Sequence, residues 1–194
     1  MLNLFWLFVI VVVGAVIIWY LNGGSTHRSA SSGTRQPTVF SLAMGDIVQY
    51  DNIDWVVEDK LTYSDSGWEW VEYLLQDGDR IGFLSVEEDD RLEVTFTEKV
   101  TDCPVENPPP TQITYQQQIF NRSETGTATL KRARHPERPV ETCQYHDYNG
   151  PNEAVMSVEF WGGSVEVSVG TQVKPYQLTF LPGDGESVYR ATGA

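Results

Sequence analysis

The chain has 194 residues, of which 41% are hydrophobic and 12% aromatic, so it can build one domain around a single core with a short segment left over. Its formal net charge at pH 7 is -14, and all 27 acidic side chains lie beyond position 40, where only 11 basic ones oppose them. A domain this acidic repels phosphate backbones, which argues against a nucleic-acid-binding function.

Residues 1–22 are predicted to form a transmembrane helix. Between Leu2 and Leu21 the one strongly polar side chain is Asn3, and a helix of about 20 residues spans roughly 30 Å of hydrocarbon. A cleaved signal peptide is the alternative, but no basic region precedes the apolar run, which exceeds the roughly 7–15 residues of a signal sequence. We therefore expect a retained single-pass anchor.

The segment after the apolar run sets the expected orientation of the domain. Arg28 and Arg35 are the basic residues that flank the helix, so the positive-inside rule places the following domain in the cytoplasm. Residues 23–40 are rich in Gly, Ser and Thr and are predicted to be a flexible linker.

From residue 41 to residue 182 the apolar residues recur with period two, which predicts strands. The first part, residues 41–101, contains these short runs of β-branched and aromatic residues: Ile47–Tyr50, Ile53–Val57, Trp68–Leu75, Ile81–Val86 and Leu92–Val100. In the last run Glu93, Thr95 and Thr97 alternate with apolar residues, so that strand should have one wet face.

A second part, residues 111–182, follows a proline-rich stretch and carries the remaining expected strands: Ile113–Phe120, Thr127–Arg132, Val155–Trp161, Ser164–Val169 and Tyr176–Leu181. About ten short strands and no long amphipathic helix predict an all-β domain, a compact antiparallel barrel or sandwich. Neither part has a complete core of its own, so we expect one joint domain. The tail, residues 183–194, is predicted to be disordered.

Trp68–Leu75 and Ile81–Val86 are predicted to form the central hairpin, around a turn at Gly78, because the first run carries apolar side chains on both faces. This hairpin belongs to a succession of motifs: Gly45–Tyr50, Trp55–Glu58, Trp68–Leu75, Phe83–Glu87 and Glu159–Val173. The succession resembles the bacterial domain-of-unknown-function 4178 family. Glu58, where that family usually has a small residue, and Phe83, where it usually has tryptophan, depart from the pattern.

The resemblance implies an all-β domain with no established catalytic residues. Members of the family are often encoded beside phage-shock-type membrane-remodelling proteins, small multi-span membrane proteins and polyamine-synthesis enzymes. This context implies a role in envelope stress or membrane maintenance. It also implies that the protein is held in the cell inner membrane and has a protein partner of the membrane-stress type.

No catalytic, cofactor or metal site is predicted, and no enzymatic activity is assigned. Cys143 and His146 are close in sequence, but Cys103 and His135 are distant, and this spacing fits neither a structural zinc site nor an activated nucleophile. The two cysteines should be free thiols in the cytoplasm and bridged outside it, and the sequence leaves that choice open.

Clusters of like charge form two further features. The acidic runs Asp77–Asp79 and Glu87–Asp90 do not follow the order of a calcium-binding loop and are interpreted as solubilising turns. The basic run over residues 131–138 supplies four candidate contacts for anionic headgroups or an acidic partner: Lys131, Arg132, Arg134 and Arg138. Its alternative role is internal compensation of the acid-rich surface.

Two functions of different classes are therefore predicted. The first is a membrane-anchored, non-catalytic β-domain that acts as a binding or scaffolding module. The alternative is a β-barrel that binds, or acts enzymatically on, a cationic, polyamine-like small molecule, because carboxylates and aromatic faces both attract ammonium groups. Its candidate pocket residues are Trp68, Glu69, Trp70 and Glu72. A deep pocket at these residues would favour the alternative, and a filled interior would favour the scaffold.

Overall fold

The computed structural model describes residues 35–185, which form a single antiparallel sheet of eleven strands. The strands are β1 (Ile47–Tyr50), β2 (Ile53–Asp65), β3 (Trp68–Asp77), β4 (Arg80–Glu88), β5 (Leu92–Val100), β6 (Gln112–Tyr115), β7 (Gln118–Arg132), β8 (Glu141–Asn149), β9 (Ala154–Trp161), β10 (Ser164–Gln172) and β11 (Thr179–Leu181). A short 3-10 helix, η1 (Pro175–Gln177), precedes β11.

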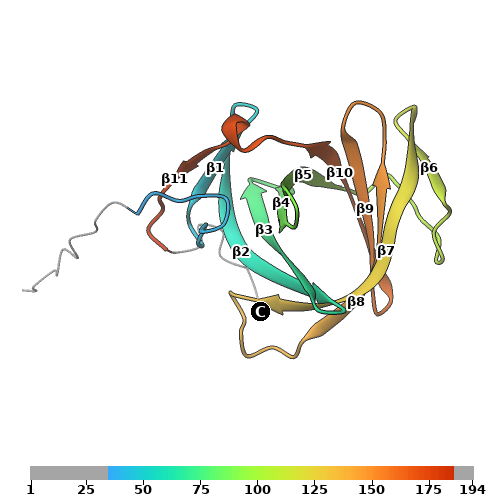
Figure 1. Ribbon diagram of the computed structural model, residues 1–194, viewed down its shortest axis with the longest axis horizontal. Helices are drawn as coiled ribbons and strands as arrows, with labels where there is room; N and C mark the ends of the chain where they lie inside the picture. Colours follow the sequence, from blue (N-terminus) through green and yellow to red (C-terminus); the bar gives the residue numbers. More distant parts are fainter. Residues whose placement is uncertain (1–34, 186–194) are drawn as a thin grey trace, which may run out of the picture. The chain divides into compact units, whose positions relative to one another are not determined.

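Eight of the strands close into a barrel. The sheet order is β11-β1-β2-β3-β4-β5-β10-β9-β8-β7-β6, and an additional pairing of β2 with β7 joins its two halves. The strands β2, β3, β4, β5, β10, β9, β8 and β7 therefore form a ring, which Figure 1 shows almost end-on. The β5–β10 and β2–β7 pairings also join the two sequence parts, 41–101 and 111–182, into one body.

A β-bulge lets β2 serve both the barrel and the extension formed by β1 and β11. The register of β2 against β3 shifts between Val57 and Asp59, so Glu58 is an extra residue and the alternation of side chains changes there. Before the bulge, Trp55 packs in the cluster that covers the outside of the barrel. After the bulge, Leu61 packs with residues of β7 and β8 inside it.

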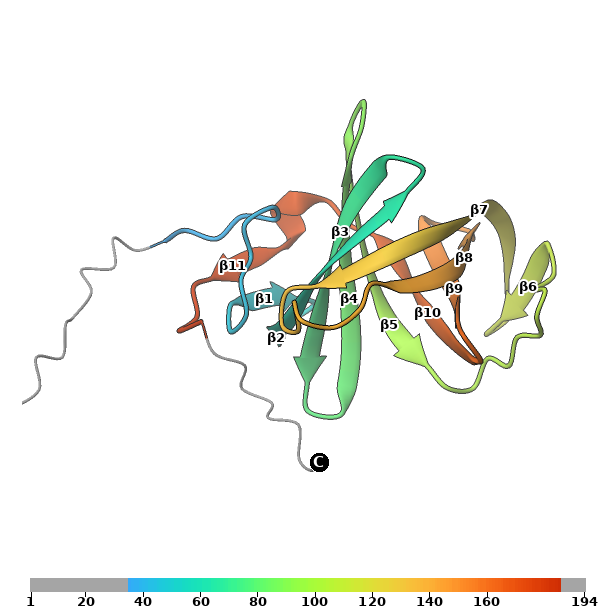
Figure 2. The same ribbon diagram turned by 90° about the horizontal axis from the view of Figure 1, so that it is seen from below.

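The apolar faces of most barrel strands point outward and are covered by the extensions. One cluster joins the outer face of β2–β5 to the N-terminal segment, β1 and the chain after β10; it includes Val39, Leu42, Val48, Trp55, Tyr73, Leu84, Phe96 and Leu178. A second cluster joins β8–β10 to β6; it includes Ile113, Phe120, Tyr148, Met156, Val158 and Val167. Figure 2 shows β1 with β11 on one side of the ring and β6 on the other. The alternate, inward positions are consequently free to be polar.

The predicted all-β antiparallel architecture is confirmed, and β1 and β5 have the predicted bounds. The predicted strand Ile113–Phe120 is divided between β6 and β7 by a turn at Gln116–Gln117, whose φ angles are 47° and 64°. The predicted strand Tyr176–Leu181 is shortened to β11 by the 3-10 helix, and β8 is not among the predicted strands. Pro37 and Val39, which belong to the predicted linker, are buried.

The predicted transmembrane helix, residues 1–22, lies outside the described residues, as do most of the predicted linker and most of the predicted disordered tail. Within residues 35–185 no helix is both long and apolar enough to cross a membrane. Near the end of this range, the backbone N–H of Gly183 donates to Asp46 Oδ1 at 2.8 Å, which fixes the chain after β11 to the start of β1.

We predict that Gly170→Ala strongly destabilises the barrel. A Cβ at Gly170 would lie 1.9 Å from the carbonyl oxygen of Phe96 and 2.6 Å from Cα of Thr97, and both are backbone atoms of the paired strand β5. Forcing the two strands apart should cost about 3 kcal/mol and lower the melting temperature of the full-length chain by roughly 5–10 °C. Gly163→Ala is the matched control, because a Cβ there meets no atom within 4 Å. Equal melting temperatures of the two variants would contradict this packing.

Candidate functional site

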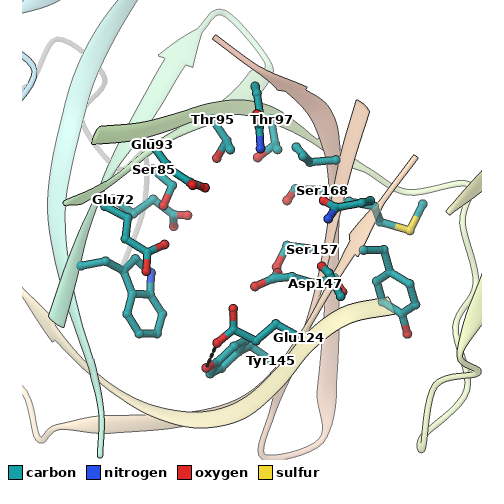
Figure 3. A pocket seen from close by; sticks show the side chains of 18 of the residues that line it. Glu72, Ser85, Glu93, Thr95, Thr97, Glu124, Tyr145, Asp147, Ser157 and Ser168 are labelled. Carbon is teal, nitrogen blue, oxygen red and sulfur yellow. Dashed lines mark hydrogen bonds between the residues drawn. The ribbon is translucent and has the colours of Figure 1, made fainter. Parts of the chain in front are cut away.

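The interior of the barrel contains a cavity of about 340 Å³. An eight-stranded barrel is just wide enough either to be filled by its own side chains or to hold one small ligand. Here the inward positions of β4, β5, β9 and β10 carry small hydroxyl side chains, which do not fill the space: Ser85, Thr95, Thr97, Ser157 and Ser168. Figure 3 shows them around the open centre of the barrel.

Six carboxylates from six different strands line the cavity: Glu72, Glu87, Glu93, Glu124, Asp147 and Glu159. Among the described residues of the lining, Arg91 is the one basic side chain, and its Nε lies 2.6 Å from Glu93 Oε1. Six carboxylates and one guanidinium leave an excess of five negative charges when all groups are ionised.

The mouth of the cavity lies at one end of the barrel. Its lining includes the starts of β3, β5 and β9 and the ends of β4, β8 and β10, which lie at the same end of an antiparallel barrel, and Trp68 and Glu87 are exposed there. Deeper in the barrel, Trp70 stacks on Tyr63 with ring centroids 5.1 Å apart and an interplanar angle of 4°. Trp70 also meets Tyr145 edge-on at 5.5 Å, and all three rings belong to the apolar cluster that forms the floor.

Four of the carboxylates face one another in cross-strand pairs. Glu87 on β4 lies directly opposite Glu93 on β5, and Glu124 on β7 lies directly opposite Asp147 on β8. Side chains at such positions have Cβ atoms about 5 Å apart, and two like charges at that distance repel by about 3 kcal/mol at an effective dielectric constant of about 20. Like charges in this arrangement destabilise the sheet unless protons or cations offset them.

Neutral aromatic donors hold three of the carboxylates in place. The hydrogen bonds run from Tyr63 Oη to Glu72 Oε1 (3.3 Å), from Trp68 Nε1 to Glu87 Oε1 (2.8 Å) and from Trp161 Nε1 to Glu159 Oε2 (3.0 Å). Tyr145 Oη also lies 3.3 Å from Glu124 Oε1, a contact drawn in Figure 3. These donors carry no charge, so they orient the carboxylates without neutralising them.

Burial is the largest cause of raised pKa values among the deepest carboxyl groups. It raises the pKa of Asp147 to about 6 and, together with the charge of Glu166, the pKa of Glu159 to about 7. The pKa of Glu72 is raised well above its ordinary value by burial and then by the charges of Glu159 and Glu166. Glu166 itself pairs with Lys99. At mildly acidic pH these groups therefore keep protons that ordinary carboxylates have lost.

The cavity carboxylates do not converge on one point. In the part of the chain that the structure describes, no group of three or more His, Cys, Asp or Glu side chains could hold a metal ion. The acids are distributed around the wall of the cavity. They therefore match a ligand with distributed positive charge better than they match a single metal ion.

Residues 43–175 match the family described as Domain of unknown function (DUF4178). The chain belongs to this family. Uncharacterized proteins of Mycobacterium tuberculosis (Rv2597) and Mycobacterium bovis (Mb2628) are 29% identical to it over 168 residues, which cover 77% of this chain and 81% of each relative. No solved structure matches the chain.

In this DUF4178 domain, three of the four pocket residues proposed from the sequence line the cavity. Trp68, Trp70 and Glu72 alternate along β3 and belong to the lining. Glu69 lies between the two tryptophans, is exposed, and does not belong to it. Because successive side chains of a strand point to opposite faces, Glu69 lies on the outer face of β3, whereas Trp68 and Trp70 lie on the face that lines the cavity.

Sequence reasoning missed the acids on the far wall of the cavity: Glu124, Asp147 and Glu159. It also interpreted Glu87 as part of a solubilising turn, whereas Glu87 lies at the mouth of the cavity. One indication was present, because the predicted wet face of β5, formed by Glu93, Thr95 and Thr97, is the face that lines the cavity.

Two of the four proposed headgroup contacts pair with buried acids. Arg134 Nη1 lies 2.9 Å from Glu58 Oε2, and Arg132 Nη1 lies 3.6 Å from Asp59 Oδ2. Both acidic side chains are at most 3% exposed. The other two proposed contacts, Lys131 and Arg138, are exposed. Arg132 and Arg134 therefore compensate the charges of buried acids, which is the alternative role predicted for the basic run. Arg134 pairs with Glu58, the residue that departs from the DUF4178 pattern.

The cysteines are free thiols in the structure. Cys143 is buried in the floor cluster, and burial raises its pKa to about 12, whereas Cys103 is half-buried. A thiol with a raised pKa is a poor nucleophile. His146 Nδ1 lies 2.8 Å from Thr125 Oγ1, and three positions along a strand place its side chain on the face opposite to that of Cys143.

We predict that the domain is more stable at pH 5 than at pH 8. Folding raises the pKa of Asp147 from 3.8 to about 6 and that of Glu159 from 4.5 to about 7. Between about pH 4 and pH 7 the folded state therefore binds more protons than the unfolded state, and stability falls as the pH rises through this window. The melting temperature of the full-length chain should drop by roughly 5 °C from pH 5 to pH 8.

Two variants test whether a cavity acid causes this pH dependence of the melting temperature. Glu159→Gln should reduce the slope and raise the melting temperature at pH 8, because it removes a carboxylate that burial disfavours. Glu69→Gln removes the same charge from an exposed position of β3 and should leave the slope unchanged. A melting temperature at pH 8 that equals or exceeds the value at pH 5 would mean that folding does not raise the pKa values of the cavity acids.

Proposed function

We propose that the barrel binds a small organic cation that carries N–H groups, such as an alkylammonium or guanidinium ion. The observation that carries this proposal is the lining, in which six carboxylates and one arginine surround a cavity of about 340 Å³. An excess of negative charge in a partly enclosed space is unfavourable unless protons or cations offset it. A cationic ligand supplies that charge at a pH where protons no longer do.

Two buried hydroxyl groups support the proposal independently of the acids. Thr97 and Ser168 line the cavity, and each is only 7% exposed. Neither side chain is hydrogen-bonded to another residue within the described part of the chain. Their oxygens face the cavity and accept hydrogen bonds readily, so each hydroxyl can accept one from an N–H group of an occupant.

The chemistry of the lining favours ligands that donate hydrogen bonds. Ionised carboxylates only accept hydrogen bonds, and hydroxyl oxygens accept them readily. Trp68 and Trp70 add aromatic surface, which attracts any organic cation, including quaternary ammonium. The acceptors outnumber the aromatic rings, so primary ammonium and guanidinium groups match the lining better than quaternary ammonium does.

The membrane-anchored scaffold expected from the sequence stays a prediction. Its anchor lies outside residues 35–185, and two of its four proposed headgroup contacts are engaged by Glu58 and Asp59. An anchor and a cation-binding barrel are compatible. The proposed cation-binding domain would then be held at the cytoplasmic face of the inner membrane, where envelope maintenance takes place.

Thermal titration of the full-length chain with three chloride salts tests the proposal. At pH 8 and constant ionic strength, butylammonium and guanidinium should raise the melting temperature, by roughly 5–10 °C at about 100 times the dissociation constant, because binding to the folded state stabilises it. Tetramethylammonium has no N–H group and should have little effect.

Paired variants show whether the cations act inside the barrel. Asp147→Asn should weaken butylammonium binding by at least about tenfold, a loss of about 1.4 kcal/mol, whereas Glu69→Gln removes one exposed charge and should leave binding unchanged. Equal effects of the three salts, or equal losses in the two variants, would mean that cations act by general screening, and the proposal would be wrong.

A further inference from the structure

Two pairs of carboxylates lie on opposite walls of the barrel. The Glu87–Glu93 pair joins β4 and β5, and the Glu124–Asp147 pair joins β7 and β8. In the closed ring, β10 and β9 separate these pairs on one side, and β2 and β3 separate them on the other. The pairs are therefore half-way around the ring from each other, and Figure 3 shows Glu93 and Asp147 on opposite sides of the cavity.

The two acid pairs interact across the lumen. Burial is the largest cause of the raised pKa of Glu87, and the charges of Glu124 and Glu93 raise it further. Burial is also the largest cause for Asp147, where the charges of Glu124 and Glu87 add to it. Each wall therefore makes ionisation of the other wall more costly.

A single monovalent cation would offset the charge repulsion within only one of the two acid pairs. At the mouth, Arg91 pairs with Glu93, but its side chain is 80% exposed, and such surface pairs contribute only about 0–1 kcal/mol. At the far wall, the donors within the described residues are neutral: the Tyr145 hydroxyl lies between Asp65 Oδ2 at 3.1 Å and Glu124 Oε1 at 3.3 Å, and Ser157 donates to Asp147. Both walls thus require positive charge from outside the chain.

Unpartnered hydroxyl groups lie between the two walls. Thr97 on β5 and Ser168 on β10 occupy the strands that lead from the Glu87–Glu93 pair toward the Glu124–Asp147 pair. Each is more than nine-tenths buried and points into the cavity. These hydroxyls offer hydrogen-bond partners to a ligand in the space between the acid pairs. This observation does not depend on the charge of the acids.

We propose that the ligand is an elongated dication of the α,ω-diamine class, with one ammonium group at each acid pair. Its chain crosses the lumen beside Trp70 and past the Thr97 and Ser168 hydroxyls. This inference rests on the proposed cation binding and adds the number and placement of the charges. A dication of this kind offsets both like-charge pairs with one molecule, whereas a single metal ion or monoamine bound at one pair offsets only that pair.

Titration of the full-length chain at pH 8 with butylamine and diaminobutane tests the inference, because the two probes differ by one ammonium group. Diaminobutane should bind at least about tenfold more tightly than butylamine. Glu87→Gln and Asp147→Asn should each weaken diaminobutane binding by about tenfold, because each removes a carboxylate from one wall. For butylamine, Asp147→Asn should weaken binding by about tenfold, as proposed above, whereas Glu87→Gln should change the affinity less than about twofold.

Glu88→Gln is the matched control, since Glu88 is the exposed neighbour of Glu87 and does not line the cavity. Equal affinities for the two amines, with Asp147→Asn still weakening the binding of both by about tenfold, would overturn the dication and leave the proposed function intact. Failure of both amines to bind would overturn both proposals. Diamine binding that Glu88→Gln weakens as much as Glu87→Gln would place the amine outside the barrel and overturn the inference.

Discussion

The pairing of β2 with β7 is the constraint on which the rest of the fold depends. β2 begins beside β1 and ends beside β7, and the β-bulge at Glu58 lies where it changes partner. The bulge buries Glu58 and Asp59 near the end of β7, where Arg134 and Arg132 neutralise them. Removing one partner of a buried ion pair leaves an uncompensated charge, at a cost of about 3–5 kcal/mol. Closure of the barrel therefore depends on the basic stretch at the end of β7.

Closure also decides which residues stabilise the domain and which remain available for binding. Leu84 and Phe96 point outward into an apolar cluster, while Ser85 and Thr95 alternate with them and point into the cavity. Burial of apolar surface, the main source of stability, thus comes largely from outside the barrel. The interior can then hold mutually repelling acids, whose cost the outer clusters and the apolar floor offset. A protein that retains such a cost across its interior is under the constraint expected of a functional site.

The strand pattern could be predicted because period two persists when one face is covered and the other faces a polar cavity. Leu92–Val100 is the clearest example, and its bounds are those of β5. β8 lacked this pattern, because Thr142, Gln144 and His146 on its outer face are polar and the inner face carries Asp147. The sequence analysis places Glu69 with Trp68 and Trp70 because proximity in sequence does not distinguish the two faces of a strand. The opposition of Glu87 and Asp147 depends on the β5–β10 and β2–β7 pairings, which local periodicity does not encode.

The mouth and the interior of the cavity respond to different conditions. At the mouth, Glu87 and Glu93 face solvent and the exposed Arg91, so dissolved salt screens their repulsion. Deeper in the barrel, Asp147 and Glu159 are largely removed from water and are held by neutral donors, so salt screens them much less. Their repulsion is relieved only by a proton or by a cation that enters the barrel. Ionic strength should therefore change mainly how a cation approaches the mouth, whereas pH should change how strongly the interior holds it.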